Sequence, residues 1–290
     1  VSTKFDYILE ELSTTVAAIT DDNGNDLDSA SEGTEVNIQL KEITPFYPEA
    51  GGQIGDTGTF SRKDGTVIAE VLDTQKAGED IILHRAKIIS GTLKTGEQIL
   101  ASVDKERRLD IRRNHTATHL MHKALREVLG THVQQAGSLV SPDYLRFDFN
   151  HFQKMTDEEV EKVEIIVNEM IRKNTAVAPH DNIPFNEAKE RGAVALFGEK
   201  YGDRVRMIQI GDFSLELCGG THIDYIGNIG EFRIVSESAV SAGVRRIVAE
   251  TGKKAQLRTG EERSVLTDLK VGYPGISRQN RESDRGKKEP

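Results

Sequence analysis

Short runs of alternating apolar and polar residues, separated by turn residues, make up the first hundred positions of the chain. Glu35–Leu40 alternates strictly, and Val67–Leu72 is largely apolar. Asp64-Gly65 and the run Asp21–Gly24 have the composition of tight turns between antiparallel strands. The pattern predicts a small β-barrel or sandwich, and we assign residues 1–100 to this first domain.

The hydrophobic period changes to that of a helix at position 114. Asn114 is a favourable N-cap and Gly130 a typical C-terminal stop, so we predict a helix that ends at Leu129. A second helix is predicted from about Thr156 to Lys173, because Glu159 follows Thr156 at capping-box spacing. Three alternating segments are expected to be half-buried strands: Tyr144–Phe149, Val205–Ile210 and Gly230–Val235. Residues 101–252 therefore form a predicted α/β domain with helices packed on an antiparallel sheet, and the whole chain is classed as α+β.

Beyond Gly252 the periodicity fails. Residues 253–290 contain ten Lys or Arg and six Asp or Glu, so this segment carries +4 while the preceding residues carry −13. We expect a basic, polar and mobile tail here. The formal net charge of −9 argues against a protein that coats nucleic acid by bulk electrostatics, although a local basic site remains open.

Two basic groups stand out within the acidic body. Lys105–Arg113 holds five basic residues, and Arg245-Arg246 forms a smaller group. Each is either solvated charge or a contact for phosphate. Because a polyanion needs a localised basic surface, we expect Arg112, Arg113, Arg245 and Arg246 to contact a phosphate backbone if the partner is a nucleic acid.

The 290 residues, 37% of them hydrophobic, are enough to bury a sizeable core. No stretch approaches the roughly 20 apolar residues of a membrane span, and the N-terminal residues lack the pattern of a secretory signal. The first residue, Val1, suggests an excised or processed chain. The single cysteine, Cys218, fits a reducing compartment, so we expect a cytoplasmic protein without a membrane partner.

Two pairs of residues have the spacing of metal ligands. His115 and His119 stand four apart on the predicted helix and project about 40° apart. Cys218 and His222 stand four apart around Gly219-Gly220, which permit a tight turn. Two such pairs, one containing the sole cysteine, predict one bound Zn²⁺ per chain.

The residues around the histidine pair bear on the ligand set and on the class of enzyme. His122 lies near the same helical face and is an alternative ligand. The apolar stripe through Ala117, Met121 and Ala124 lies on the other side, so we expect the histidine face to turn away from the core. The helix lacks the glutamate that a helical zinc protease uses as a base, which disfavours a protease. No residue before about position 100 is expected to belong to the metal site.

Several segments together resemble one family, the editing region of alanyl-tRNA synthetase and the related free-standing alanyl-tRNA editing proteins. The segments, in order, are Thr44–Gly58, Arg113–Leu120, Gln134–Ser138, Leu217–His222 and Ser241–Ile247. The stretch Ala193–Tyr201 is similar to the long synthetase form. The editing domain of threonyl-tRNA synthetase shares the metal spacing but lacks the glycine-rich element before it.

The resemblance implies a zinc-dependent hydrolase that cleaves serine or glycine from wrongly charged tRNA(Ala), with no role for DNA. It implies that the aminoacylation domain lies outside the chain, so no ATP site is expected. It places Thr118 and Gln135 in the pocket beside the metal, and we count both, with Cys218, as catalytic candidates. Substrate or tRNA contacts are expected from the glycine-rich segments and the arginines: Gly51, Gly52, Gln53, Asp56, Gly219, Gly220, Arg112, Arg113, Arg245 and Arg246.

Alternatives from other classes remain. The chain could act as a free-standing deacylase, or as a module in which zinc is structural and the acceptor stem is bound without hydrolysis. A zinc amidohydrolase independent of nucleic acid is disfavoured, because neither metal motif contains an obvious acid or base. Four protein ligands would close a tetrahedral site, so either one ligand is labile or the metal organises the pocket.

Overall fold

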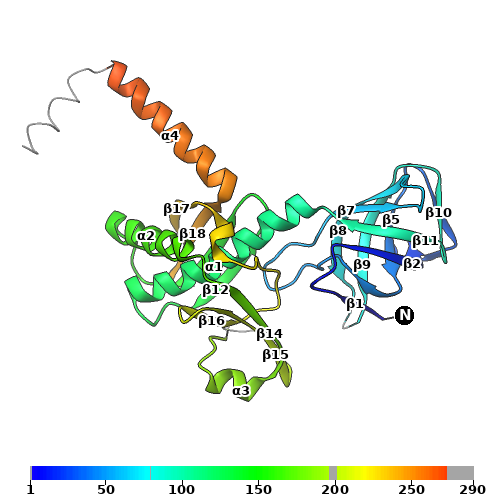
Figure 1. The fold of residues 1–290 in the computed structure, drawn as a ribbon, viewed down its shortest axis with the longest axis horizontal. Helices are drawn as coiled ribbons and strands as arrows, with labels where there is room; N and C mark the ends of the chain where they lie inside the picture. Colours follow the sequence, from blue (N-terminus) through cyan, green and yellow to red (C-terminus); the bar gives the residue numbers. More distant parts are fainter. Residues whose placement is uncertain (1, 79, 196–200, 273–290) are drawn as a thin grey trace, which may run out of the picture.

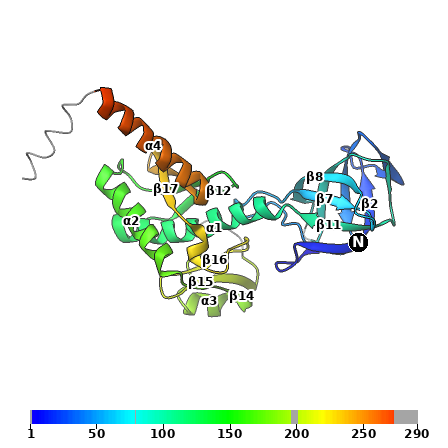
Figure 2. The ribbon, with the colours of Figure 1, turned by 45° about the horizontal axis from the view of Figure 1, so that its top comes forward.

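The computed structural model describes residues 2–78, 80–195 and 201–272. Figure 1 shows a barrel at one end of the molecule, two further sheets with their helices at the other, and helix α1 (Lys105–Leu129) running between them. In Figure 2, a loop from the barrel half extends beside α1 toward the second body. The mixed architecture confirms the predicted fold class.

The barrel is closed by six antiparallel strands. Their order is β11-β7-β8-β9-β5-β2, and β11 also pairs with β2, which joins the two ends. Apolar side chains such as Ile38, Phe60 and Ile68 fill the interior and are fully buried. The closing strands are β2 (Glu11–Thr20), β5 (Glu35–Leu40), β7 (Gly58–Ser61), β8 (Val67–Lys76), β9 (Ile82–Ile88) and β11 (Gln98–Val103). The shorter strands are β1 (Thr3–Phe5), β3 (Asp26–Leu27), β4 (Ser29–Ser31), β6 (Glu42–Thr44) and β10 (Thr92–Lys94).

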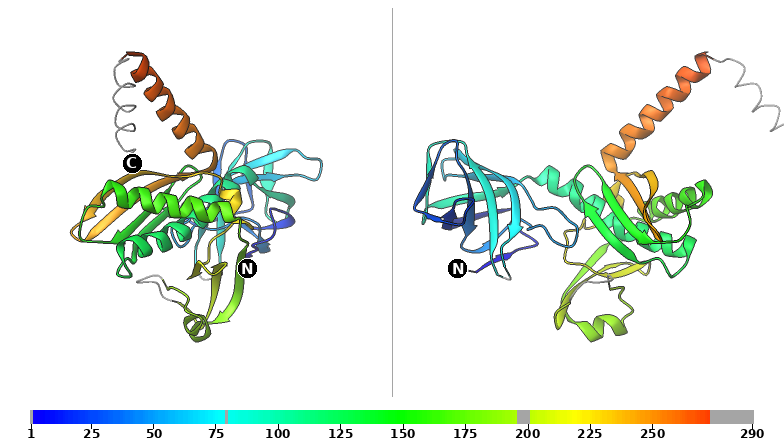
Figure 3. Two further views of the ribbon diagram at one scale, coloured as in Figure 1. Left: turned by 60° about the vertical axis from the view of Figure 1, so that its left-hand side comes forward. Right: turned by 180° about the vertical axis from the view of Figure 1, so that it is seen from behind.

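The second body contains two antiparallel sheets, ordered β12-β13-β18-β17 and β14-β15-β16. Helices α1 and α2 share one core with the four-stranded sheet, in which Phe147, Phe149 and Ile247 are fully buried; Figure 3 shows both helices against this sheet. The strands are β12 (Gln135–Val140), β13 (Leu145–Asn150), β14 (Val177–Pro184), β15 (Arg204–Ile210), β16 (Ser214–Leu217), β17 (Phe232–Ser241) and β18 (Val244–Thr251). The remaining helices are α2 (Asp157–Lys173), α3 (Phe185–Glu190), the 3₁₀ turn η1 (Ile226–Ile229) and α4 (Gly252–Gly272).

Helix α2 has the predicted capping box, because Thr156 and Glu159 bond each other's backbone. The predicted start of α1 is wrong: the helix begins at Lys105, with Asp104 as its N-cap. Asn114 instead lies within the helix, where its buried amide donates to the carbonyl of Ser141 at 2.8 Å. The charged first turns of α1 hide the apolar period that would have marked this start.

Both faces of α1 are buried along the stretch that carries the histidines. Every residue from Asn114 to His122 is buried. The expectation that the histidine face turns away from the interior is therefore wrong, because it is buried as deeply as the apolar stripe. The sequence also did not predict α4, which occupies the first part of the expected tail and projects from the second body in Figure 1. The expectation of mobility for residues 273–290 lies outside the described residues.

A buried ion pair ties the start of α1 to the barrel half. Arg108 is fully buried, Asp56 is 1% exposed, and Asp56 Oδ2 accepts from Arg108 Nε at 2.8 Å. The same oxygen accepts from the backbone N–H of Tyr47 at 2.7 Å, and Arg108 also donates to the carbonyl of Pro45 at 2.7 Å. Asp56 therefore does not face solvent as a tRNA contact, and its expected role is corrected to that of an internal anchor.

Among the described helices, none is both long and apolar enough to cross a membrane.

We predict that Arg108→Met destabilises the protein by about 3 to 5 kcal/mol, because it leaves the buried Asp56 carboxylate without its cation. Lys123→Met on the same helix is the matched control, since its pair with Glu127 is exposed and contributes at most about 0.5 kcal/mol. Urea unfolding followed by circular dichroism measures both. Equal losses in the two variants would show that the buried pair does not hold α1 to the barrel.

Candidate functional site

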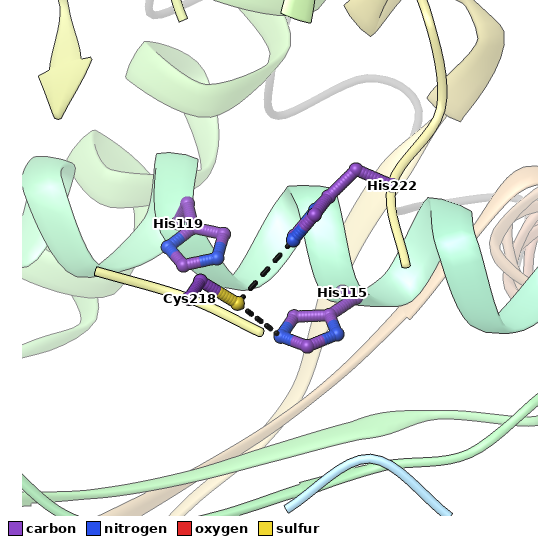
Figure 4. Close-up of side chains that lie close together, drawn as sticks. All are labelled: His115, His119, Cys218 and His222. Carbon is purple, nitrogen blue, oxygen red and sulfur yellow. Dashed lines mark hydrogen bonds between the residues drawn. The ribbon is translucent and has the colours of Figure 1, made fainter. Parts of the chain in front are cut away.

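Two distant segments bring four potential metal ligands together. Helix α1 supplies His115 and His119, and the loop after β16 supplies Cys218 and His222. Their ligand atoms all lie within 4.8 Å of one another. The Sγ atom of Cys218 is 3.3 Å from Nε2 of His115 and 3.3 Å from Nε2 of His222, as Figure 4 shows. Three imidazoles and one thiol converging in this way are a set of donors suited to zinc and other borderline or soft cations.

Gln53, which belongs to the barrel half, orients His115. Its Oε1 lies 2.7 Å from Nδ1 of His115 and accepts from the backbone N–H of Thr221 at 2.9 Å. Its Nε2 donates to the hydroxyl of Thr221 at 3.0 Å, and the amide is fully buried. Since Oε1 can only accept, His115 carries its proton on Nδ1 and directs the Nε2 lone pair into the cluster. The expectation that no residue before about 100 belongs to the metal site is wrong, and Gln53 is too deeply buried to contact tRNA.

Glu216 holds the second histidine. Its carboxylate lies 2.5 Å from Nδ1 of His119 and 3.0 Å from Nδ1 of His122. Nε2 of His119 is buried and has no hydrogen-bond partner among the described residues, which is the arrangement of a ligand atom aimed at a cation. His122 bonds Oε1 of the same carboxylate, and its Nε2 is also buried and unpartnered in the described part of the chain, but it is not one of the four clustered residues.

Thr116 holds the third histidine. Its hydroxyl donates to the carbonyl of Arg112 at 2.8 Å and lies 3.2 Å from Nδ1 of His222. Because its one proton is already used, Thr116 accepts from Nδ1–H and leaves Nε2 of His222 free for a metal. All three imidazoles therefore have an oxygen acceptor behind them, which is the arrangement expected around a bound cation.

The charges of the site also favour a cation. Burial would raise the pKa of Cys218, but the three neighbouring histidines lower it well below its ordinary value. Burial would also raise the pKa of Glu216, yet His119 and His122 lower it to about 2. The thiolate and the carboxylate thus place two negative charges in a buried site, which a bound divalent cation would balance.

The two glycines of the metal loop differ sharply in their surroundings. A Cβ added at Gly220 would lie 1.9 Å from Cε1 of His115, whereas one at Gly219 would meet only the Tyr7 hydroxyl, at 3.9 Å.

Two side chains form hydrogen bonds with the carbonyl groups of the metal loop. Arg206 donates to Cys218 O at 3.1 Å and to Gly220 O at 2.8 Å, and Tyr7 donates to Gly219 O at 2.7 Å. Arg206 also stacks on the Tyr7 ring, 4.1 Å from its centroid.

A cavity of about 530 Å³ opens beside the cluster. Its wall includes Thr118 and Gln135, the two pocket residues expected from the resemblance, together with Ser138 and Phe147. The hydroxyl of Thr118 donates to the carbonyl of Asn114 at 2.8 Å, so its lone pairs remain available to accept a hydrogen bond. The cavity also touches the predicted contacts Gly51, Gly219 and Gly220.

The glycine-rich turn of the barrel half docks on the second body. Gly51 and Gly52 both have positive φ, at 58° and 82°, and a Cβ at Gly52 would lie 2.7 Å from the carbonyl oxygen of Ser138. The carbonyl of Gly52 accepts from the N–H of Val140 at 2.7 Å. The turn therefore places Gln53 against His115 and forms one side of the cavity.

The four arginines expected to contact phosphate all have acidic partners. Each is paired with an acid: Arg112 with Glu10 at 3.3 Å, Arg113 with Asp110 at 2.6 Å, Arg245 with Glu237 at 2.5 Å and Arg246 with Asp148 at 2.7 Å. None of these four described side chains lines the cavity. The cavity is thus lined by Thr118 and Gln135 beside the clustered residues, and not by these four arginines.

Sequence reasoning missed the residues that support the ligands. Thr116 and Thr221 adjoin ligands in the sequence and could have been noticed. Glu216 had one signal, because a glutamate two positions before Cys218 in an apolar strand lies on the same face as the cysteine. Arg206 and Tyr7 carried no signal, since only the folded chain brings them to the loop.

Comparison with known proteins relates the chain to aminoacyl-tRNA synthetases. A family model described as "Threonyl and Alanyl tRNA synthetase second additional domain" matches residues 205–248, and one described as "tRNA synthetases class II (A)" matches residues 1–107. The chain is 51% identical over 243 residues to the alanine–tRNA ligase of Acetivibrio thermocellus and 50% identical over 254 residues to that of Geobacillus kaustophilus. These alignments cover 84% and 88% of the chain but only 27% and 28% of the relatives.

The fold, the clustered ligands and both models define the class: a part of a class II aminoacyl-tRNA synthetase that includes the second additional domain. The similarity to alanine–tRNA ligases extends over most of the chain. The chain belongs to the alanyl-tRNA synthetase family, and it spans about a quarter of the length of the curated relatives it matches. The segment 193–201 that resembled the long form lies partly outside the described residues, at 196–200.

We predict that Gly220→Ala weakens metal binding at least about tenfold, because the new methyl group collides with the His115 ring and displaces a ligand. Gly219→Ala is the matched control, since its methyl group enters open space. Competition with a chelator, followed by the absorption of Co²⁺ bound to the thiolate, measures both. Equal affinities would show that His115 is not a ligand.

We also predict that metal binding releases a proton from His119. Burial disfavours its charged form, but Glu216 outweighs burial and raises the pKa of His119 to about 10 in the metal-free protein. A cation must displace this proton from Nε2, so apparent affinity should rise about tenfold per pH unit below that pKa. Calorimetry in buffers of different ionisation enthalpy should count about one proton near neutral pH, and fewer in Glu216→Gln. An unchanged count in Glu216→Gln would show that the carboxylate does not set this protonation state.

Proposed function

We propose that the chain is the editing part of an alanyl-tRNA synthetase, a zinc-dependent hydrolase that cleaves the ester of Ser-tRNA(Ala) and Gly-tRNA(Ala). The observation that carries the proposal is the cavity that opens onto the His115, His119, Cys218 and His222 cluster and is lined by Thr118 and Gln135. A polar side chain inside a partly apolar cavity is what a site needs to select one small amino acid over another. The family relation supports tRNA as the carrier of that amino acid.

Such a site answers a specific chemical problem. Serine differs from alanine by one hydroxyl group, and an apolar synthetic pocket cannot strongly reject it. A second pocket that hydrogen-bonds the hydroxyl reverses the preference. Thr118 suits this role, because its own proton is donated to the carbonyl of Asn114 and its lone pairs can accept from the serine hydroxyl.

The reaction makes modest demands on the protein. Water adds across the ester bond, and the products are the free amino acid and a tRNA with its terminal hydroxyl restored. An aminoacyl ester is already activated, so positioning and stabilisation of the developing oxyanion are the main requirements. Gln135 can donate to the ester oxygen or accept from the attacking water. A bound Zn²⁺ would supply a positive charge and a Lewis acid beside the cavity.

A second candidate is favoured by one feature of the cluster. Four protein ligands complete a tetrahedral site, which is the pattern of structural rather than catalytic zinc. The chain would then hold the acceptor end of the tRNA without hydrolysing the ester. Deacylation of seryl-, glycyl- and alanyl-tRNA(Ala) separates the two: the hydrolase removes serine and glycine and spares alanine, and the binding module removes none of them.

We predict that Thr118→Val lowers kcat/KM for the seryl ester by about 5- to 150-fold, which corresponds to about 1 to 3 kcal/mol for a lost buried hydrogen bond. The glycyl ester should lose much less, because it has no hydroxyl to bind. Thr118→Ser keeps the hydroxyl and is the matched control, while Gln135→Ala should slow both esters alike. Steady-state kinetics on both substrates measure these effects. Equal losses for the two esters in Thr118→Val would show that Thr118 does not select serine.

A further inference from the structure

The far side of the cavity is built by the barrel half and is rich in cationic side chains. Lys4 on β1 and Lys76 at the end of β8 both line it, and Arg204 on β15 of the second body lines the cavity as well. Arg204 bonds Asn182, which is neutral, and the two lysines have no acidic partner within 4.0 Å among the described residues. These three positive charges therefore remain uncompensated at the cavity.

The acids that line the same cavity do not cancel this charge. Glu216 is engaged by His119 and His122 at its inner end, and Asp80 is the other acid of the lining. Three unpaired cations against one exposed acid leave a positive rim, although residues 1–252 as a whole carry −13. A local positive rim in an acidic body attracts a polyanion to this place and repels it elsewhere.

Aromatic rings lie along the same side. Phe5 and Tyr7 both line the cavity, and their ring centroids are 4.7 Å apart in an edge-to-face arrangement. Both side chains are partly buried: Arg206 lies over one face of the Tyr7 ring, and Tyr47 and Arg108 lie against the Phe5 ring. The parts of the two rings that line the cavity offer apolar contact to unpaired bases, while the neighbouring lysines are placed for phosphates.

We propose that this barrel-side wall binds the single-stranded 3′ end of the tRNA, with Lys4 and Lys76 contacting its phosphates. The inference rests on the proposed function and names the surface that would deliver the ester to Thr118 and the metal cluster. It assigns the phosphate contacts to the rim of the cavity. Arg112, Arg113, Arg245 and Arg246 are paired with acids and do not line the cavity.

The wall lies next to the metal cluster, where it could guide a tRNA end. The glycine-rich turn and Gln53 already attach the barrel half to the metal cluster, so the wall and the ligands keep a constant spacing. Tyr7 stands at the junction, because its hydroxyl holds Gly219 while its ring lines the cavity. A strand end that lies along this wall would lead its terminal ester toward the cluster.

The test is binding of two RNA hairpins to the full chain, measured by fluorescence anisotropy over a range of salt concentrations. One hairpin carries a short single-stranded 3′ end, and the other is blunt. Replacing Lys4 and Lys76 by Met should lower affinity for the first hairpin about tenfold and reduce its salt slope by about 0.7 for each lost phosphate contact, without changing the blunt hairpin. Lys63→Met with Lys94→Met is the matched control, because both are exposed barrel lysines that do not line the cavity.

Two results would overturn the inference. If the Lys4/Lys76 variant binds the overhanging hairpin like the unsubstituted chain, the wall does not contact phosphate. If both hairpins lose affinity equally, the lysines contact the duplex and not its single-stranded end. If the unsubstituted chain fails to deacylate seryl-tRNA(Ala), the proposed function is wrong. The hairpin measurement detects binding without hydrolysis, so its outcome can be separated from that failure.

Discussion

The buried amide of Gln53 is the interaction on which the rest of the site depends. It lies in a turn of the barrel half, yet it bonds both Nδ1 of His115 and the backbone of Thr221, which belong to the two segments that supply the ligands. An unpaired buried amide is costly, so the turn, helix α1 and the metal loop are stable together and poorly stable apart. The barrel is therefore a structural part of the metal centre and not merely its neighbour in the sequence.

Helix α1 connects the barrel half to the metal cluster and to the core of the second body. Its first turns are anchored to the barrel half by the buried pair of Arg108 with Asp56. Its middle carries the histidines, and its apolar stripe shares a core with α2 and the four-stranded sheet. One helix thus connects the barrel, the metal cluster and the core of the second body, and the cavity is lined by residues of both halves.

The cluster places negative charges next to histidines in the interior of the protein. Glu216 and the Cys218 thiolate bring negative charge inside the protein, which burial alone would oppose. The histidines and their oxygen partners make this charge tolerable and leave three Nε2 atoms directed inward. The same network orients the loop in which Gly220 packs directly against the His115 ring, and Thr118 lies on the same helix one position before His119.

Local patterns were enough to predict the mixed fold class and the four clustered residues, because strand alternation, capping residues and ligand spacing are all read within short segments. They did not predict the start of α1 or helix α4, since charged turns mask a helical period. The burial of Asp56 and Gln53, the acidic partners of the four arginines and the place of Lys4 and Lys76 at the cavity became visible only in the folded chain. Burial and charge pairing depend on which distant segments come into contact, and the spacing of residues along the chain does not encode those contacts.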